Sequence, residues 1–311
     1  MTVDRETVHL AYQLLLGREP ENEQVIDNFL PVSDAFALGS LFRNSHEFTT
    51  QYLPTFHESK WVATEVLDRF VQWVDLRDRY VSRGCLTGGW EANETSYFEA
   101  RLNTGDTVLD IGANIGWFSL VAAKHIGPHG VVHAFEPRPE TNRMLKRTIV
   151  DNRLQSVIHL WPYALSDQPA LLDLMWAPVG DNPGGSHLRG EGEPGGQVFA
   201  KVLAVRLDDL LPDIAPDIVK IDIEGAEPMA LAGAVNALSR KHPPILSELH
   251  VHQLRVLAGR SPREYISQLG DLGYACYLLE DGRPTQRLHD FPPGHGGLVS
   301  VVFEWRAGLI E

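Results

Sequence analysis

The first group of residues whose types and spacing could do chemistry stands between 108 and 119. An apolar run ends at Asp110, and the turn Gly112-Ala113-Asn114-Ile115-Gly116 then opens an amphipathic stretch with helical spacing. Glycines let a backbone turn tightly and approach a ligand closely at the free N-terminus of a helix. The pattern differs from the dinucleotide fingerprint, because Asn114 stands where that fingerprint needs its second glycine. The segment predicts a nucleotide-type pocket.

The acidic residues around this turn indicate the kind of ligand. A carboxylate at Asp110 would repel a pyrophosphate and would suit a ligand with an ammonium group, such as S-adenosylmethionine (SAM). Glu136 ends the next apolar run, where a carboxylate can accept hydrogen bonds from both hydroxyls of a ribose. NAD and SAM both carry that ribose, so Glu136 does not separate them. Capping the helix that starts near Pro139 is a second role, compatible with the first.

A second acidic group follows two later apolar runs. Asp222 starts the stretch Asp222-Ile223-Glu224-Gly225-Ala226-Glu227, and Glu248-Leu249-His250 ends the next run. Ligands of parallel α/β sheets bind beyond the carboxyl ends of the strands, where these residues fall. Asp222 could shape the pocket or accept a proton. Glu224 and Glu227 also suit the N-terminus of a helix without any role in chemistry, and we prefer that interpretation for Glu227.

Glu248 and His250 lie two residues apart, so a strand would place them on the same side. A histidine with a pKa of about 6.5 can act as a general base when a carboxylate orients it. A solvated histidine at a strand end is the alternative. A magnesium or manganese cluster of Asp222, Glu224, Glu248, His250 and His252 is another, but no tight ligand spacing demands it, and we predict no metal.

The elements that must position these residues alternate between strands and helices. Parallel strands covered on both faces are typical of short apolar runs separated by helical stretches. The last two runs flank the glycine- and proline-rich stretch 281–297 and should pair as an antiparallel hairpin. The sequence therefore predicts an α/β fold with a seven-stranded, mostly parallel sheet and a terminal antiparallel hairpin. The expected strands are 107–111, 131–135, 157–160, 218–221, 245–249, 275–279 and 298–303, and the expected helices 115–125, 139–151, 226–238 and 262–272.

The chain divides into three segments at this level. Residues 1–56 show helical periodicity and predict a small helical domain. Residues 57–104 predict a linker helix (Trp61 to Tyr80) and an approach segment that includes Gly88-Gly89-Trp90-Glu91, and 105–311 form the main domain. Residues 176–197 hold seven glycines and three prolines, which predicts a loop that is either a lid or an insertion without a role. His187 in this loop could touch a substrate or be solvated.

Composition excludes several classes of protein. The 311 residues are 43% hydrophobic and 22% charged, as in ordinary soluble proteins. No apolar run reaches the ~20 residues of a membrane span, and the N-terminus has no signal pattern. Cys85 and Cys276 are too few for a disulfide framework and favour a reducing, cytoplasmic setting. A net charge of −14 argues against a nucleic-acid partner.

Several motifs in order resemble one known family. Asp110–Gly116, Phe135-Glu136-Pro137, Ala164–Asp167, Leu207–Leu210 and Val219–Glu227 together resemble the FkbM family of SAM-dependent methyltransferases, over about 90 to 250. The resemblance implies the class I, Rossmann-like methyltransferase fold and SAM as cofactor. It implies that Asp110 serves the methionine end, Glu136 the ribose and the Ala164 region the adenine. The cofactor-binding residues expected from it are Asp110, Gly112, Ala113, Asn114, Gly116, Glu136, Pro137, Ala164 and Asp222, and the expected catalytic residues are Asp222, Glu248 and His250.

The N-terminal segment resembles a domain of unknown function found beside surface-glycan enzymes. The marks are Leu15–Pro20 (Leu-Leu-Gly-Arg-Glu-Pro) and Ser45-His46-Glu47-Phe48. A helical bundle that only caps the main domain is the alternative. The association favours a SAM-dependent O-methyltransferase that acts on a hydroxyl of a sugar or glycan-like acceptor. A methyltransferase tailoring a secondary metabolite, a macrolide or a peptide, is the nearest alternative, and an NAD-dependent oxidoreductase and a non-catalytic scaffold are more remote.

Overall fold

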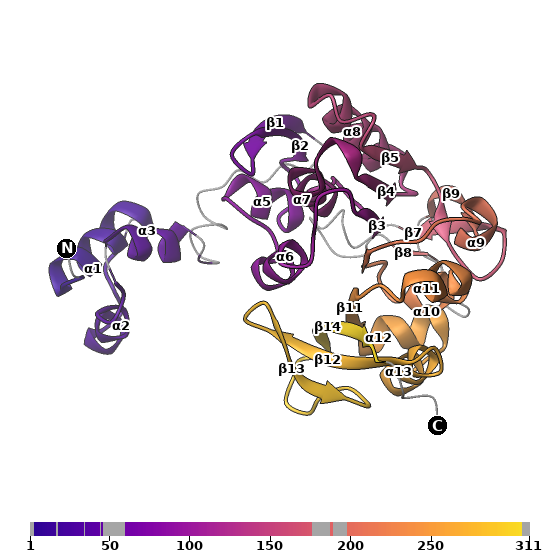
Figure 1. Ribbon diagram of the computed structural model, residues 1–311. Helices are drawn as coiled ribbons and strands as arrows, with labels where there is room; N and C mark the ends of the chain where they lie inside the picture. Colours follow the sequence, from indigo (N-terminus) through magenta and orange to yellow (C-terminus); the bar gives the residue numbers. More distant parts are fainter. Residues whose placement is uncertain are drawn as a thin grey trace. The chain divides into compact units, whose positions relative to one another are not determined.

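The computed structural model describes residues 3–16, 18–33, 35–43, 45, 60–175, 187–188 and 198–306 (Figure 1). The chain forms two compact units, Met1–Glu58 and Ser59–Glu311. The segment that follows residue 60 therefore belongs to the larger unit and is no separate linker. No described helix is long and apolar enough to cross a membrane.

The N-terminal unit is helical, as its periodicity predicts. Its helices are α1 (Arg5–Ala11), continued by the π-helical turn η1 (Tyr12–Leu16), α2 (Glu23–Phe29) and α3 (Ala35–Arg43). Asp4 and Asn22 accept backbone N–H groups at the starts of α1 and α2, which supplies partners to the free donors there. Tyr12, Phe29 and Phe42 pack ring against ring in the core of this unit.

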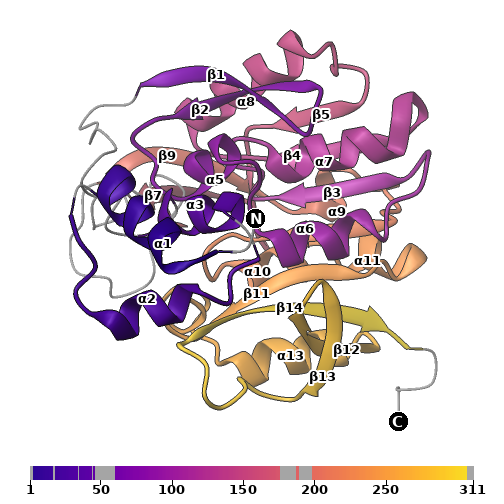
Figure 2. The same cartoon turned by 90° about the vertical axis from the view of Figure 1, so that its left-hand side faces the viewer.

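An eight-stranded sheet forms the centre of the larger unit, in the order β13-β12-β14-β11-β10-β3-β4-β5. Figure 2 shows β5, β4 and β3 above β11, β14, β12 and β13. The middle strands are parallel, whereas β14 is antiparallel to both β11 and β12. The strands are β3 (Thr107–Ile111), β4 (Val131–Phe135), β5 (Ile158–Trp161), β10 (Ile218–Ile221), β11 (Ile245–His250), β12 (Tyr274–Glu280), β13 (Arg283–Leu288) and β14 (Leu298–Trp305).

The expected number of seven strands is wrong by one. The extra strand, β13, lies inside the stretch 281–297, and only Leu288 among its six residues is buried, so it has no apolar run. The predicted antiparallel pair β12–β14 exists, but the hairpin joins β12 to β13 through Asp281 and Gly282, both with positive φ. Asp-Gly is a favoured two-residue hairpin turn.

Helices cover both faces of the sheet. One core contains residues of α6 (Ala92–Glu99), α7 (Trp117–Ile126) and α8 (Pro139–Asp151), and the other contains residues of α10 (Glu227–Ala232), α11 (Val235–Lys241) and α13 (Pro262–Gly270). The single helix expected at 226–238 is two helices. The Asp208 carboxylate accepts the N–H groups of Asn236 and Ala237 and so caps a new helix start at α11.

The linker helix expected from Trp61 to Tyr80 is wrong. The segment forms an antiparallel hairpin, β1 (Trp61–Val66) and β2 (Phe70–Asp75), followed by α5 (Val81–Leu86). Leu67 and Asp68 both have positive φ at the turn. Trp73 in β2 donates to Thr148 and Asp151 of α8, so contacts with a distant helix stabilise the strands. Tertiary contacts of this kind commonly override a periodic pattern.

Short elements complete the larger unit. A second sheet, which the sequence did not suggest, has the order β6-β9-β7-β8. The segment 176–197 lies outside the described residues apart from the two-residue strand β8, so its role as a lid stays a prediction. The elements are β6 (Ala164–Leu165), β7 (Ala170–Met175), β8 (His187–Leu188), β9 (Val198–Val205), α9 (Leu207–Leu210), α12 (Val251–Gln253), η2 (Gly127–His129) and η4 (Leu254–Ala258).

Candidate active site

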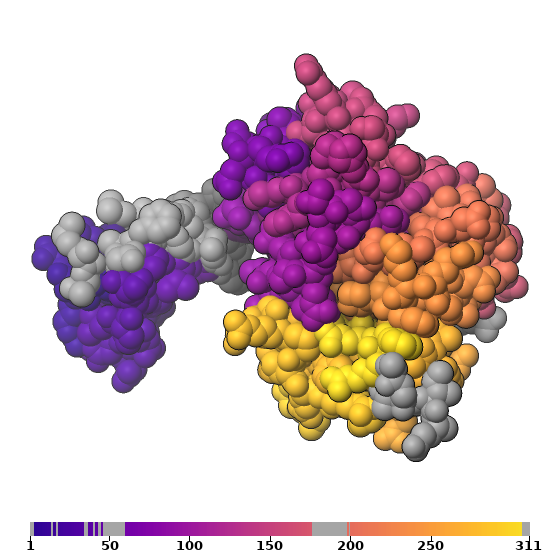
Figure 3. Space-filling view, in the orientation of Figure 1, coloured from indigo at the N-terminus to yellow at the C-terminus, as the bar shows by residue number. Residues whose placement is uncertain are grey.

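A pocket opens beyond the carboxyl ends of β3, β4, β10 and β11. Its wall includes residues near the ends of these strands or directly after them, together with residues of α7 and of the segment before α6. In the space-filling view, the purple segment with α6 and α7 meets the yellow C-terminal strands along one face (Figure 3). The lining includes the predicted residues Gly112, Ala113, Asn114, Glu136, Pro137, Ala164, Asp222 and Glu248.

The glycine turn after β3 is closely packed between two strands. The N–H groups of Gly112 and Ala113 both donate to the carbonyl oxygen of Phe135, at 3.0 and 2.9 Å. Gly112 has φ +83°, and a Cβ there would lie 2.0 Å from the carbonyl oxygen of Asp222. Only glycine fits this contact, so the turn fixes the distance between the end of β3 and the end of β10.

Glu136 provides a buried acceptor on the pocket wall and is 7% exposed. Its carboxylate accepts the N–H groups of Asn114, at 2.9 Å, and Arg138, at 2.8 Å. Burial raises its pKa to about 7, although these two bonds and the charge of Arg138 oppose the rise. A carboxylate has about four acceptor positions, so two remain for ligand hydroxyls.

These features fit SAM. Glu136 would supply acceptors for the ribose hydroxyls, and the glycine turn would let a ligand approach the backbone. Phe135, Ala164 and Leu165 supply an apolar wall suited to the adenine. The residues that would hold the cofactor come from β3, β4 and β6 and from the turns that follow them.

Three predicted site residues do not line the pocket. Asp110 is 1% exposed behind the turn, where it accepts the hydroxyl of Ser119 at 2.6 Å, and burial raises its pKa. Gly116 precedes α7 and packs toward Leu145 of α8. His250 accepts the N–H of Gln253, and burial lowers its pKa. Contact of these residues with cofactor or acceptor stays a prediction.

Three further carboxylates of the lining lie close together. Glu91, Asp222 and Glu248 each place an oxygen so that all three atoms lie within 4.8 Å of one another. Burial raises the pKa of Glu91 to about 7 and that of Glu248 well above its usual value. Glu224 lines the same pocket, and burial raises its pKa to about 8.

A buried ammonium lies beside these acids. Lys220 Nζ lies 3.2 Å from Asp222 Oδ2 and 4.8 Å from the centre of the Phe118 ring. Burial alone would lower its pKa, but Asp222, Glu91 and other acids outweigh burial and raise it. Lys220 is therefore charged and balances part of the negative charge of the carboxylates.

The sequence interpretation assigned no role to Lys220 or Glu91. Lys220 stands two residues before Asp222 at the end of a strand, so the period-two rule that paired Glu248 with His250 could have found it. Glu91 lies in the approach segment, 131 positions before Asp222. No local pattern predicts that contact, because it depends on how α6 packs.

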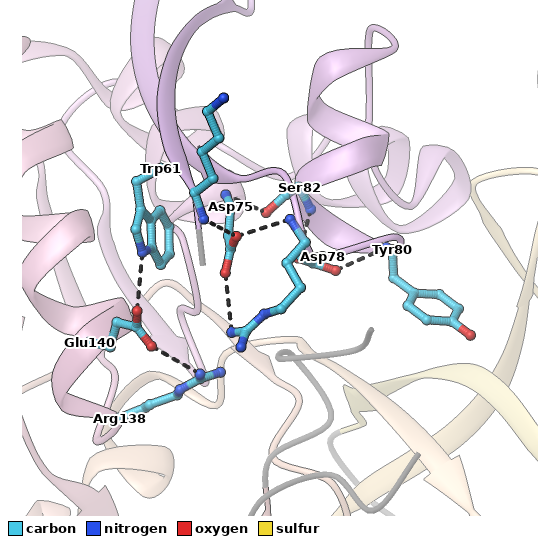
Figure 4. Close-up of polar contacts among 9 residues, drawn as sticks. Trp61, Asp75, Asp78, Tyr80, Ser82, Arg138 and Glu140 are labelled. Atoms are coloured by element: carbon cyan, nitrogen blue, oxygen red, sulfur yellow. Dashed lines mark hydrogen bonds and ion pairs between the residues drawn. The ribbon is translucent and has the colours of Figure 1, made fainter. Parts of the chain in front are cut away.

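The β1–β2 hairpin is attached to the pocket by a polar network (Figure 4). Trp61 Nε1 donates to Glu140, which also accepts a guanidinium N–H of Arg138, each at 3.2 Å. Asp78 is buried and accepts the backbone N–H of Tyr80 at 2.9 Å. Since Arg138 lines the pocket, the contacts that start at Trp61 let the hairpin position part of its wall.

Comparisons with known proteins agree with this arrangement. The family model described as "Methyltransferase FkbM domain" matches residues 110–276. The chain is 30% identical over 178 residues to 31-O-demethyl-FK506 methyltransferase FkbM of Streptomyces tacrolimicus, covering 48% of this chain and 67% of that protein. It is 32% identical over 167 residues to Methyltransferase sdnD of Sordaria araneosa, covering 44% and 63%.

Among solved structures, the chain is similar to that of Methyltransferase FkbM from Methylobacillus flagellatus KT. The two are 18% identical with a TM-score of 0.43, over 94% of this chain and 58% of that one. The matched part of the chain spans about two thirds of the length of each of the two curated relatives. The family match covers more than half of the chain and includes most of the residues that line the pocket. The chain belongs to the FkbM methyltransferase family and is a SAM-dependent methyltransferase.

Proposed function

We propose that this protein transfers the methyl group of SAM to a hydroxyl of a sugar or glycan-like acceptor. The observation that carries the proposal is the meeting of Glu91, Asp222 and Glu248 in the pocket that holds Glu136. Carboxylates accept hydrogen bonds from hydroxyls, and they can take up the proton that a hydroxyl loses. Such a cluster suits an oxygen nucleophile.

SAM supplies an electrophilic methyl group and a good leaving group. The protein must then align the acceptor and remove a proton. Glu136 binds the ribose, and the turn at Gly112 fixes the distance between the cofactor and the end of β10. Lys220 holds Asp222 in place through their ion pair, and Asp222 orients the acceptor hydroxyl as a hydrogen-bond acceptor.

The aromatic part of the lining favours a sugar. Tyr80, Trp90 and Trp117 line the same pocket as the carboxylates. Trp117 Nε1 donates to Thr95 Oγ1 at 2.9 Å, and that hydroxyl donates to the carbonyl oxygen of Trp90 at 2.8 Å. Flat apolar rings beside hydrogen-bond acceptors suit a pyranose, which has apolar faces and a hydroxylated rim. The resemblance of the N-terminal unit to domains beside surface-glycan enzymes supports the same class by association.

A secondary metabolite is the second candidate acceptor. The name of the Streptomyces tacrolimicus relative describes methylation of an oxygen of FK506. A macrolide also combines apolar surface with hydroxyls, so the same lining suits it.

We propose a cytoplasmic location and no nucleic-acid acceptor, on the basis of the buried free Cys85 and Cys276 and the net charge of −14.

Turnover with a defined panel tests the acceptor class. The full chain is incubated with methyl-labelled SAM and either methyl glycosides of hexoses and deoxyhexoses or 31-O-demethyl-FK506. Mass spectrometry then detects one added methyl group, and NMR locates it. Methylation of a glycoside hydroxyl supports the proposal, whereas methylation of the macrolide alone favours the second candidate. The Asp222→Asn variant is the control for methylation outside the site. Binding of S-adenosylhomocysteine (SAH) to this variant would show that it is folded.

A further inference from the structure

Glu91 stands at the start of α6 in a backbone conformation that residues with side chains rarely adopt. Its φ is +46° and its ψ is +65°, in the left-handed region. Among the described residues, eight other than glycine have a positive φ, and three of them, Glu91, Asn114 and Glu224, line the pocket. Strained conformations persist only where the surroundings impose them, and they cluster at functional sites.

Contacts on both sides of Glu91 impose this conformation. Trp90 packs against Gly84 of α5, where an added Cβ would lie 2.6 Å from Trp90 Cε3. On the other side, Thr95 donates its backbone N–H to the Glu91 carbonyl oxygen at 2.8 Å and its hydroxyl to the Trp90 carbonyl oxygen. Trp117 of α7 in turn donates to Thr95 Oγ1. The Glu91 backbone is therefore fixed to α5 and α7, and its side chain lines the pocket.

The neighbours of the Glu91 carboxylate differ in their freedom to take up a proton. Asp222 is paired with the Lys220 ammonium at 3.2 Å, so this charged donor already occupies one of its oxygens. Glu248 lies next to both Asp222 and Glu91, whose negative charges favour its protonated form. Among the described residues, no cation lies within ion-pair distance of Glu91, although the charge of Lys220 acts on it. It is the acid of the three best placed to accept a proton.

This inference rests on the proposed hydroxyl acceptor. We propose that Glu91 is a catalytic residue that takes the proton of the acceptor hydroxyl. The Lys220–Asp222 pair and Glu248 keep the groups around it in position. As the bond from the acceptor oxygen to the methyl carbon forms, the bond from sulfur to that carbon breaks and its electron pair stays on sulfur. The hydroxyl proton passes to a Glu91 carboxylate oxygen and then to solvent.

The protonation behaviour of Glu91 agrees with that role. Burial raises its pKa to about 7, the charge of Lys220 opposes the rise, and Asp222 and Glu94 add to it. A base is most effective when its pKa lies near the working pH. His250, the histidine predicted for this role, does not line the pocket.

Three variants of the full chain are used in both readouts of the test, and a fourth, Glu91→Asp, is added in the second. Glu91→Gln keeps the size of the side chain but cannot take up a proton. Glu91→Gly removes the carboxyl and relieves the left-handed strain, so it should unfold at no lower urea concentration than the wild type. Glu99→Gln is the matched control, because Glu99 lies on the same helix, pairs with His125 and does not line the pocket.

The first readout needs no acceptor. Infrared titration of protein with ¹³C-carboxyl-labelled glutamate should lose one carboxyl that titrates near pH 7 in Glu91→Gln, but not in Glu99→Gln. SAH affinity by calorimetry should stay within twofold in all three variants. An unchanged infrared titration in Glu91→Gln overturns the proposal. A loss of SAH affinity beyond tenfold in both Glu91 variants also overturns it, because that result would assign Glu91 to the cofactor.

The second readout uses the acceptor found in the panel. Glu91→Gln and Glu91→Gly should lower kcat at least 100-fold, and Glu91→Asp should restore part of it. The kcat/KM of the wild type should fall below pH 7. The residual activity of Glu91→Gln should not show this fall. Full turnover in Glu91→Gln overturns the role of Glu91 and leaves the acceptor class standing. If no glycoside is methylated but the infrared band is lost, the acceptor class fails while the assignment of the titrating carboxyl stands.

Discussion

Lys220 and Asp222 form an ion pair of 3.2 Å at the end of β10, in the middle of the candidate site. The Lys220 side chain is 7% exposed, and that of Asp222 is 28% exposed. Lys220 lies opposite Asp110 in the parallel register of β10 and β3. The pair therefore lies between Asp110, the buried acid behind the glycine turn, and the acids that line the pocket.

Removing the ammonium should destabilise the protein. Lys220→Met leaves Asp222, Glu91 and Glu248 without the neighbouring positive charge, and breaking a buried pair from one side costs about 3–5 kcal/mol. Because Asp222 is partly exposed, we expect a loss near the lower end, about 3 kcal/mol, in urea unfolding at pH 7. Lys241→Met is the control, since Lys241 pairs with Asp217 at the surface. Equal losses in the two variants would contradict this account.

Cofactor binding should be linked to a proton at Glu136. Its pKa is about 7 in the free protein, and ribose hydroxyls donate to the ionised form, so binding should release protons at pH 7. Calorimetry of SAH binding in buffers of different ionisation enthalpy measures this release. Glu136→Gln should abolish it and weaken SAH binding by about 1.5–3 kcal/mol, the value of a hydrogen bond to a charged group. Glu140→Gln, which alters the neighbouring network, should still release the proton.

Glu227 should make the protein less stable as the pH rises from about 4.5 to 7. Burial raises its pKa in the folded protein to about 7, although it accepts the N–H groups of Ile223 and Gly225. Above pH 4.5 the unfolded chain has lost this proton while the folded chain retains it, so the free energy of unfolding falls with pH until about pH 7. The contribution is at most about 3 kcal/mol. Urea unfolding of Glu227→Gln should show a flatter pH dependence in this window, and an unchanged slope would contradict it.

The glycine turn can be tested with two glycines of similar backbone conformation. Gly112 has φ +83° and Gly105 has φ +89°, but only at Gly112 would a Cβ meet the Asp222 backbone. Gly105→Ala should cost only the conformational strain, about 1–2 kcal/mol. Gly112→Ala should lose more stability and should also lose SAH binding, because β3 and β10 must move apart. Normal SAH affinity in a folded Gly112→Ala protein would show that the turn does not set the pocket.

Much of the sheet could be predicted from the sequence. The strands at Thr107–Ile111, Val131–Phe135 and Ile218–Ile221 have the predicted bounds, because each is a short buried run with a polar or glycine residue after it. The β1–β2 hairpin could not be predicted in this way. It is stabilised by contacts with α8, such as the hydrogen bond from Trp73 to Thr148, that no local pattern contains.

The residues of the site likewise fall into those that the sequence predicts and those that it does not. Glu136 and Asp222 directly follow strands and Glu248 lies near the end of β11, so the sheet itself predicts that they gather at one edge. Glu91 comes from the segment before α6, and its place depends on Trp90 packing against Gly84. Residues that reach a pocket through tertiary packing of a loop are those that sequence reasoning misses.

The carboxylates around Lys220 lead to a last prediction, about metal ions. Three oxygens within 4.8 Å would suit a divalent cation, but the Lys220 ammonium already lies beside them and would repel one. We therefore expect millimolar Mn²⁺ to leave the melting temperature of the wild type unchanged and to raise that of Lys220→Met, since an ion that binds only the folded state stabilises it. Lys220→Met combined with Glu91→Gln and Glu248→Gln should lose that response. A rise of similar size in the wild type and in Lys220→Met would mean that Mn²⁺ binds despite the ammonium or binds elsewhere, and the variant with three substitutions distinguishes these two cases.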